Sequence, residues 1–289
     1  MREFDTPHPI SVSLDLPAGD ARFVAGSRRD TVVEVAPALF LSPADQRTAK
    51  QTEVSFADGV LMVRVPRESG LFGRNGAVHV TISLPAGSHV TGRTSSGDFH
   101  AEGRLGDCTF RAGSGNVKLH DTGALNVEAS SGDVTVRNAY GDVDVTARSG
   151  NVRIGDIDGS AAVEISSGDV RLGEVAGPLR IDGANGNVSV EQAADDVTVK
   201  VRSGNIDVGE VVGGSVRIES TSGDLQVGVR EGSTARVDAS TRSGNVRNAF
   251  TDSGDGDRSG ATVAVYARTT SGDIRVRRSG KVGARPEAR

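Results

Sequence analysis

The chain has 289 residues, of which 38 are glycine and only 3% are aromatic, and its net charge is −5. No apolar run approaches the about 18 residues of a transmembrane helix, the negative charge argues against nucleic acid as a partner, and one cysteine excludes an internal disulfide. Because residues 1–16 lack the apolar core of a secretory signal, we expect a cytoplasmic protein. A location at the cell surface would require non-standard export.

The first 90 residues predict several β-strands. Apolar and polar residues alternate from Ile10 to Leu16, which is typical of a half-buried strand, and Val32–Val35 and Val78–Leu84 indicate two more. Asp58 and Gly59 stand between two apolar runs, a pattern that predicts a β-hairpin.

One short helix is also expected in this region. Ser42 followed by Pro43 is typical of a helix start, and we expect the helix to run from Pro43 to about Gln51. An open end of a repeat array exposes unpaired backbone groups. We therefore interpret residues 1–90 as a β-rich cap with one short helix.

An internal repeat organises residues 91–278. A unit of Ser (once Asn), Gly, Asp or Asn and then an apolar residue recurs ten times. Its glycines are Gly97, Gly115, Gly132, Gly150, Gly168, Gly186, Gly204, Gly223, Gly244 and Gly272. Successive glycines are 18, 17, 18, 18, 18, 18, 19, 21 and 28 residues apart. A weaker copy lies halfway between, as at Tyr140–Val143, so each coil of about 18 residues holds two short strands.

Two architectures fit this repeat: an antiparallel meander and a β-solenoid in which each strand stacks on its equivalent one coil later. The uniform period and the Val, Ile and Leu at the alternating positions favour the solenoid. The residue after the glycine is never Asp in two successive copies, which keeps like charges apart in a parallel stack. A meander would also separate these residues. We interpret the fold as an all-β solenoid, with residues 279–289 as a disordered basic tail.

The repeated Asp and Asn residues do not follow the calcium-binding pattern of β-rolls, in which Asp comes two residues after the last glycine. We interpret them as turn residues that hydrogen-bond to their own local backbone. The sequence contains no nucleophile elbow, no His-Glu-x-x-His motif and no phosphate-binding glycine loop. We therefore expect no enzyme, no catalytic residue, no metal and no other cofactor.

Basic residues recur at the outward position of the first strand in each coil. They are Lys118, Arg153, Arg171, Arg247 and Arg275. Such a basic face could recognise an anionic polymer, such as a teichoic or uronic chain, or it could be a solvated sheet face.

Leu71, Phe72 and Arg74 are the candidates for a partner contact. The two apolar side chains stand in an otherwise polar loop and need cover, either from the cap itself or from a partner. Cys108 is interpreted as a small buried apolar residue without a redox role.

The repeated Ser-Gly-Asp-Val and Ser-Gly-Asn-Val units, with strands such as Leu172–Val175, resemble a bacterial β-strand-repeat domain of unknown function labelled "putative adhesin". The opening from Phe4 to Val12 and the segment from Leu71 to Arg74 look like members without a signal peptide. The resemblance covers about residues 1–278. It implies a β-solenoid with an adhesive or interaction role and no established catalytic residues.

We therefore expect a non-enzymatic, adhesin-like binding or scaffold module that presents a rigid, repetitive β-surface to a protein or an anionic polymer. The alternatives are a cytoplasmic self-assembling scaffold and, less favoured because long loops are few, a carbohydrate-active β-helix enzyme. We expect a monomer or a weak homo-oligomer.

Overall fold

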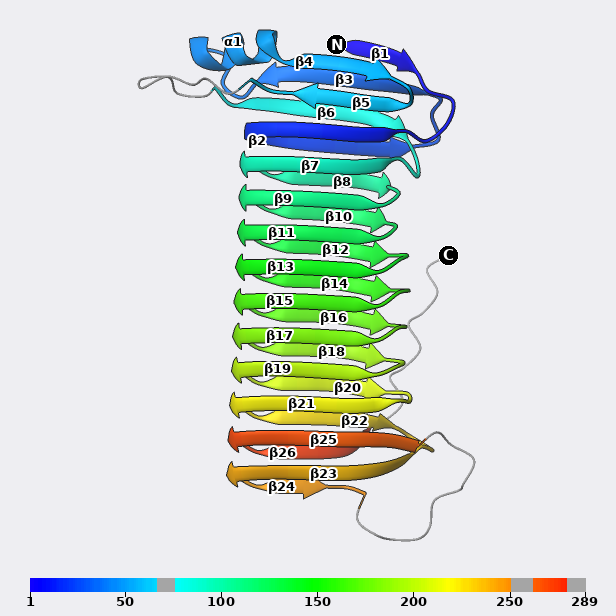
Figure 1. Cartoon of the computed structure of the whole chain (residues 1–289), viewed down its shortest axis with the longest axis vertical. Coiled ribbons are helices and arrows are strands. Elements are labelled where there is room, and N and C mark those ends of the chain that lie inside the picture. Colours follow the sequence, from blue (N-terminus) through cyan, green and yellow to red (C-terminus); the bar gives the residue numbers. More distant parts are fainter. Residues whose placement is uncertain (67–75, 251–261, 280–289) are drawn as a thin grey trace. The chain divides into compact units, whose positions relative to one another are not determined.

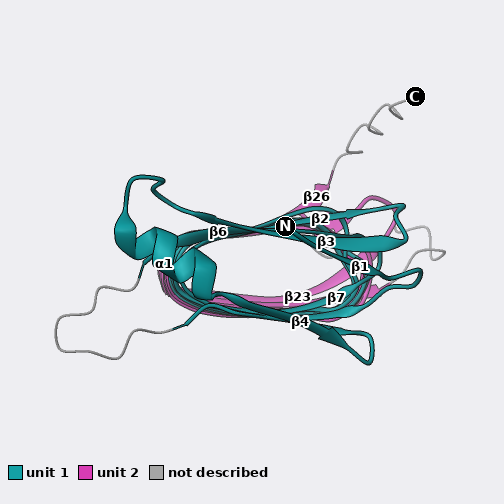
Figure 2. Cartoon of the chain, turned by 90° about the horizontal axis from the view of Figure 1, so that it is seen from above, with its two compact units in different colours: residues 1–159 teal, residues 160–289 magenta. Residues whose placement is uncertain are grey.

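The computed structural model describes residues 1–66, 76–250 and 262–279, and the chain divides into two compact units, Met1–Gly159 and Ser160–Arg289 (Figure 2). The described residues form 26 strands and one helix. Each unit consists of two layers of mainly parallel strands (Figure 1). The all-β solenoid expected from the sequence is confirmed.

Unit 1 begins with the elements β1 (Arg2–Asp5), β2 (Ser11–Gly26), β3 (Asp30–Pro37), α1 (Pro43–Gln51), β4 (Glu53–Ala57), β5 (Val60–Arg64) and β6 (Val78–Pro85). Its repeat strands are β7 (His89–Ser96), β8 (Phe99–Arg104), β9 (Cys108–Ser114), β10 (Val117–Thr122), β11 (Leu125–Ser131), β12 (Val134–Ala139), β13 (Val143–Ser149) and β14 (Val152–Ile157). We call the layer of β8, β10, β12 and β14 sheet A, and the layer of β7, β9, β11 and β13 sheet B.

Strands of unit 1 pair with their equivalents one coil away, and the pairing is parallel throughout its repeat region. The register brings Val117 beside Val134, and Leu119 beside Val136. All four of these side chains are buried. The 18-residue period therefore aligns valine and leucine columns between the sheets, and the antiparallel meander is excluded for these strands.

The few aromatic residues of the interior gather in the first coils of unit 1. Phe23, Phe99 and Phe110 are fully buried, and the ring centroids of Phe99 and Phe110 lie 4.9 Å apart. Gly92 faces them, and a β-carbon there would meet the Phe99 ring at 2.9 Å. The missing side chain of Gly92 thus makes room for the aromatic cluster.

The expected features of the N-terminal region are present. The helix spans Pro43–Gln51, and the hydroxyl of Ser42 accepts a hydrogen bond from the Asp45 backbone N–H. Strands β4 and β5 form the antiparallel hairpin, with Asp58 and Gly59 in the turn at φ 51° and 75°. Pairing is antiparallel at the outer edges, where β3 lies on β6 and β1 on β3.

Strand β2 supplies a complete coil inside this region. Its first half pairs in parallel with β5 and β7, and its second half pairs in parallel with β6 and β8. Gly19 occupies the turn between the halves, at φ 109°. The repeat architecture therefore starts with residues 11–26.

Unit 2 holds β15 (Ala161–Ser167), β16 (Val170–Val175), β17 (Leu179–Asn185), β18 (Val188–Ala193), β19 (Val197–Ser203), β20 (Ile206–Val211), β21 (Ser215–Ser222), β22 (Leu225–Arg230), β23 (Thr234–Ser243), β24 (Val246–Asn248), β25 (Thr262–Ser271) and β26 (Ile274–Ser279). Ser279 is buried. Residues 280–289, the remainder of the expected tail, lie outside the described residues.

The last coils of unit 2 do not stack in chain order. Strand β25 pairs with both β21 and β23, and β26 pairs with both β22 and β24 (Figure 1). Asp273 therefore neighbours Asp224, with its backbone N–H donating to the Asp224 carboxylate at 2.8 Å. The expectation that Asp never neighbours Asp in the stack is wrong here, because it assumed stacking in chain order. Asp20 and Asp98 also neighbour one another.

The turn Asp and Asn side chains link neighbouring coils. The prediction that they hydrogen-bond to their own local backbone is wrong. In unit 1, Oδ1 of Asn116 accepts from the Asp133 backbone N–H at 2.9 Å, and Oδ1 of Asp133 accepts from the Asn151 backbone N–H at 2.8 Å. In unit 2 the same ladder joins Asp169, Asn187, Asn205, Asp224, Asp273 and Asn245. Parallel stacking places each carbonyl or carboxylate oxygen beside the next turn, which is why one ladder runs through each set of coils.

Asp133 makes this ladder sensitive to acid. The Asn151 backbone N–H, helped by the Asn151 amide and the Arg153 guanidinium, holds the pKa of Asp133 below its usual 3.8, although partial burial opposes this. A carboxyl group with a lowered folded-state pKa stabilises the fold above its unfolded pKa, and this contribution is lost as the pH falls through the folded value. We expect Asp133→Ala to destabilise the protein by about 1 kcal/mol at pH 7.

The matched variant is Asp133→Asn, which keeps an oxygen acceptor for the Asn151 N–H. Urea unfolding should show that Asp133→Asn loses less free energy of unfolding at pH 7 than Asp133→Ala. Between pH 7 and pH 3, the free energy of unfolding of Asp133→Asn should also change less than that of the unmodified protein. Equal losses for the two variants at pH 7 would show that the ladder hydrogen bond does not contribute to stability.

Candidate functional site

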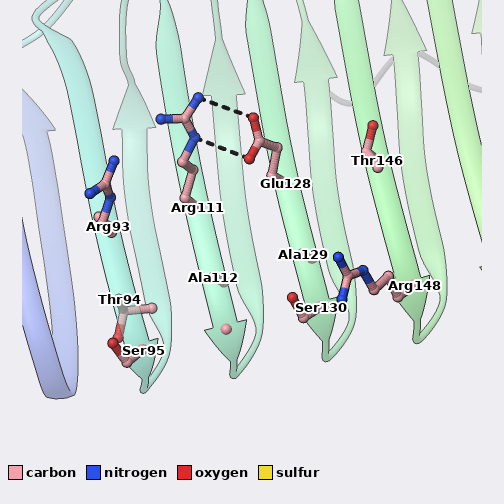
Figure 3. A pocket seen from close by; sticks show the side chains of 11 residues that line it. Arg93, Thr94, Ser95, Arg111, Ala112, Glu128, Ala129, Ser130, Thr146 and Arg148 are labelled. Carbon is pink, nitrogen blue, oxygen red and sulfur yellow. Dashed lines mark hydrogen bonds and ion pairs between the residues drawn. The ribbon is translucent and has the colours of Figure 1, made fainter.

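A shallow hollow on the outer face of sheet B in unit 1 is the candidate site (Figure 3). Its volume is about 540 Å³. It is lined by Arg93, Thr94, Ser95, Arg111, Ala112, Gly113, Glu128, Ala129, Ser130, Thr146 and Arg148. We call it the arginine trough.

The register of β7, β9, β11 and β13 creates the trough. One outward row reads Arg93, Arg111, Glu128 and Thr146 across the four strands. The next outward row crosses the same four strands and consists of Ser95 on β7, Gly113 on β9, Ser130 on β11 and Arg148 on β13. Small side chains there leave the backbone as a floor, and the longer residues form the walls.

The charges of the trough are unevenly neutralised. Nε and Nη2 of Arg111 donate to the two carboxylate oxygens of Glu128, each at 3.1 Å (Figure 3). Among the described residues, the exposed guanidinium groups of Arg93 and Arg148 have no hydrogen-bond or ion-pair partner. With three arginines and one glutamate, the trough carries an excess of two positive charges.

A second, smaller hollow of about 220 Å³ adjoins the trough at Arg93. It is lined by Ser13, Leu14, Asp15, Met62, Val63, Arg64, Thr91 and Arg93. The register places Asp15 between Arg64 and Arg93. The outward row with Arg93 therefore continues onto β2 and β5, with one further acidic residue in it.

The basic residues expected on the first strand of each coil lie on the other layer. In unit 1, Lys118 and Arg153 occupy one outward column of sheet A, with Thr135 between them. Nη1 of Arg153 lies 3.3 Å from the Asp133 carboxylate. This column therefore carries less unpaired positive charge than its sequence suggests.

The corresponding column of unit 2 contains the other three residues. Arg171 stands at β16 and forms an ion pair with Asp169 at 3.0 Å. Arg275 pairs in register with both Gln226 and Arg247, so Arg275 precedes Arg247 in the stack, contrary to their order in the sequence. The structure brings Arg275 and Arg247 together, while Ser189, Asp207 and Gln226 separate them from Arg171.

Leu71, Phe72 and Arg74, the expected partner contact, lie outside the described residues. Cys108 is buried, and this burial raises the pKa of its thiol to about 11. Because the thiolate is the reactive form, the Cys108 thiol is unreactive near neutral pH. In the described ranges, no group of three or more His, Cys, Asp or Glu residues could hold a metal ion.

Sequence reasoning missed Arg93, Arg111 and Arg148. Each stands one to three residues before the serine or glycine of a repeat turn, at an outward position of the second strand. Comparing all outward positions of that strand would have shown the basic residues. The hollow itself needs the register, because it depends on Gly113 lying between Ser95 and Ser130.

Comparison with protein families decides the family. The model of the family described as Toastrack DUF4097 matches residues 43–277. The chain belongs to this family. Toastrack DUF4097 is a domain of unknown function, and the resemblance to β-strand-repeat domains noted in the sequence is confirmed.

Solved structures from Bacteroides fragilis and Parabacteroides distasonis are similar to this toastrack chain. A "putative adhesin" from Bacteroides fragilis is 11% identical, with 95% of each chain covered and a TM-score of 0.33. A "putative adhesin" from Parabacteroides distasonis is 16% identical over 78% of this chain and 95% of that one, with a TM-score of 0.43. A "putative lipid binding protein" from the same species is 11% identical over 96% of each chain, with a TM-score of 0.34.

No curated protein matches the chain. The helix α1 spans nine residues, and the described part of the chain contains no helix with the length and apolar character needed to cross a bilayer.

Proposed function

We propose that this toastrack protein is a non-enzymatic binding module whose arginine trough holds acidic groups of an anionic polymer. The observation that carries the proposal is the pair of guanidinium groups of Arg93 and Arg148 in one polar hollow, which have no hydrogen-bond or ion-pair partner in the part of the chain that the structure describes. Guanidinium groups bind carboxylate and phosphate oxygens through paired N–H donors. The hydroxyl groups of Ser95, Ser130 and Thr146 add neutral hydrogen-bonding partners.

The spacing of the two arginines favours a ligand with more than one acidic group. Arg93 and Arg148 stand on β7 and β13, which are three strand intervals apart in sheet B. Three intervals are about 14 Å. A single small anion in contact with Arg93 would leave Arg148 free, whereas a polymer with repeated acidic groups can engage both.

The rigid backbone supports a binding role. The floor of the trough is paired on both sides in a parallel sheet, so the arginines are presented without a folding step on binding. Arg111 is held by two hydrogen bonds to Glu128, so this ion pair adds no net charge to the trough.

The test measures binding of fluorescent poly(glycerol phosphate) and polygalacturonate by anisotropy at low and moderate salt. We expect Arg93→Gln/Arg148→Gln to weaken binding about ten-fold, because two exposed charge contacts are lost. The matched control, Lys118→Gln/Arg153→Gln, removes the same charge from sheet A and should have little effect.

If the control variant weakens binding and the trough variant does not, the polymer binds the basic column of sheet A. If neither polymer binds, the proposal fails. The alternative of a self-assembling scaffold stays a prediction. Among the described strands, none pairs with the outer edge of β23 or β24, where such assembly would begin.

A further inference from the structure

The segment between β3 and α1 exposes three consecutive apolar side chains. Leu39, Phe40 and Leu41 are 68%, 78% and 89% exposed. They form the turn that precedes the helix of unit 1 (Figure 1). Single exposed apolar residues are common on protein surfaces, whereas a contiguous apolar group is a candidate interaction site.

This turn is held in a fixed conformation by hydrogen bonds to its backbone. The Ser42 N–H donates to the Leu39 carbonyl at 3.0 Å, and the Leu39 N–H donates to the buried Asp45 carboxylate at 3.0 Å. The Gln46 amide donates to the Phe40 carbonyl at 2.6 Å. The other carboxylate oxygen of Asp45 accepts from the Ala77 N–H at 3.1 Å, which ties the turn to the start of β6.

These hydrogen bonds lower the cost of moving the turn from water into an apolar environment. A backbone polar group that leaves water without a partner carries a large cost in an apolar medium. In this turn both polar groups of Leu39, the carbonyl of Phe40 and the N–H of Ser42 already have partners within the protein. The turn can therefore leave water with much of its backbone satisfied and its apolar side chains pointing outward.

The helix that follows the turn carries two exposed positive charges. Pro43, Arg47 and Lys50 are exposed and lie on one face of α1, at positions i, i+4 and i+7. The helical rise places Arg47 and Lys50 about 6 and 10 Å along the helix from Pro43. Asp45, the acidic residue of the helix, is buried and engaged with the turn, so the exposed charges of α1 are both positive.

The small size of the apolar group favours a lipid surface over a protein as the binding partner. Three side chains cover far less than the about 1,000 Å² that a stable protein interface needs. A bilayer surface accepts a few apolar side chains at the depth of the headgroups and attracts neighbouring lysine and arginine side chains when its lipids are anionic. We propose that the Leu39–Leu41 turn inserts into the interface of an anionic lipid surface, with Arg47 and Lys50 beside the headgroups.

The chain contains no tryptophan, which gives a direct probe of this proposal. In Phe40→Trp, the single tryptophan should shift its emission to shorter wavelength on mixing with vesicles of phosphatidylglycerol and phosphatidylcholine. Brominated lipids in the same vesicles should quench it. The matched control is Tyr140→Trp, which places a tryptophan at an exposed aromatic position away from the turn and should show neither change.

Two further variants separate the apolar and the charged contributions. In the Phe40→Trp background, Leu39→Ser/Leu41→Ser should abolish the shift. Arg47→Gln/Lys50→Gln should weaken binding to anionic vesicles about five-fold per charge removed, with little effect on pure phosphatidylcholine. The helix and turn bonds do not involve these side chains, so circular dichroism should be unchanged.

The proposal is overturned if Phe40→Trp shows no shift with anionic vesicles, or if Tyr140→Trp shifts equally. Sedimentation velocity without vesicles tests whether the turn instead binds a second copy of this chain. If the unmodified protein sediments as an oligomer and Leu39→Ser/Leu41→Ser sediments with a lower mass, the turn contacts a second copy of this chain, and the lipid proposal is wrong.

Discussion

Gly132→Ala is expected to destabilise unit 1 by about 2–5 kcal/mol. Gly132 has φ 124°, a conformation that L side chains rarely adopt, and its N–H donates to the Ser149 carbonyl of the next coil at 3.1 Å. A β-carbon at this position would overlap with the carbonyl oxygen of Gly115, its equivalent in the preceding coil. Since that oxygen belongs to a paired backbone, the overlap can be relieved only by separating the coils.

Two other glycines separate the conformational effect from the overlap. Gly59 has φ 75° but no atom within 4 Å of an added β-carbon, so Gly59→Ala should cost only the unfavourable dihedral angle. Gly26 has neither a positive φ nor a close neighbour, and Gly26→Ala should be nearly neutral. Urea unfolding of the three variants should rank the losses as Gly132, then Gly59, then Gly26. Equal losses at Gly132 and Gly59 would show that the coils tolerate the added carbon.

The glycine and valine pattern explains why the sequence predicted the coils. Alternating apolar residues define which side of each strand is buried, and a glycine at constant spacing defines each turn. The helix was also predictable, because Ser42 and Pro43 are local signals that act on the next few residues. These features depend on neighbours in the chain.

The order of the last coils could not be predicted in the same way. Each coil presents nearly the same strand edge to the next. The repeat pattern of β21 therefore fits β23 and β25 equally well. The sequence shows only that 28 residues separate Gly244 from Gly272. The choice depends on packing between segments distant in the chain, as the contact between Asp224 and Asp273 demonstrates.

The arginine trough and the apolar turn were missed for different reasons. The trough combines Arg93, Arg111 and Arg148 across strands, and an error of one residue in register would turn these side chains to the other face. The turn at Leu39–Leu41 is local, but an apolar run between two elements usually packs inward. Only its hydrogen bonds and exposure show that it is held outward.

Deleting one whole coil of unit 2 should leave a folded protein. Removal of residues 168–185 joins Ser167 to Gly186 and takes away β16 and β17 together. The register pairs Ala161 with Leu179 and Leu179 with Val197, so Ala161 can pair with Val197 after the deletion without changing the buried face of either strand. We expect β-type circular dichroism and one cooperative melting transition, shifted to lower temperature by the loss of one set of coil contacts.

Deleting half a coil should have a much larger effect. Removal of residues 168–176 places β17 directly after β15, so each later strand must enter the opposite sheet. Gly186 and Gly204 then no longer lie in the column of turn glycines, and the Asp and Asn ladder is broken at the junction. We expect a loss of at least about 5 kcal/mol, seen as a midpoint lowered by 10 °C or more or as a non-cooperative transition. If the two deletions melt alike, the two-strand coil is not the structural unit of this fold.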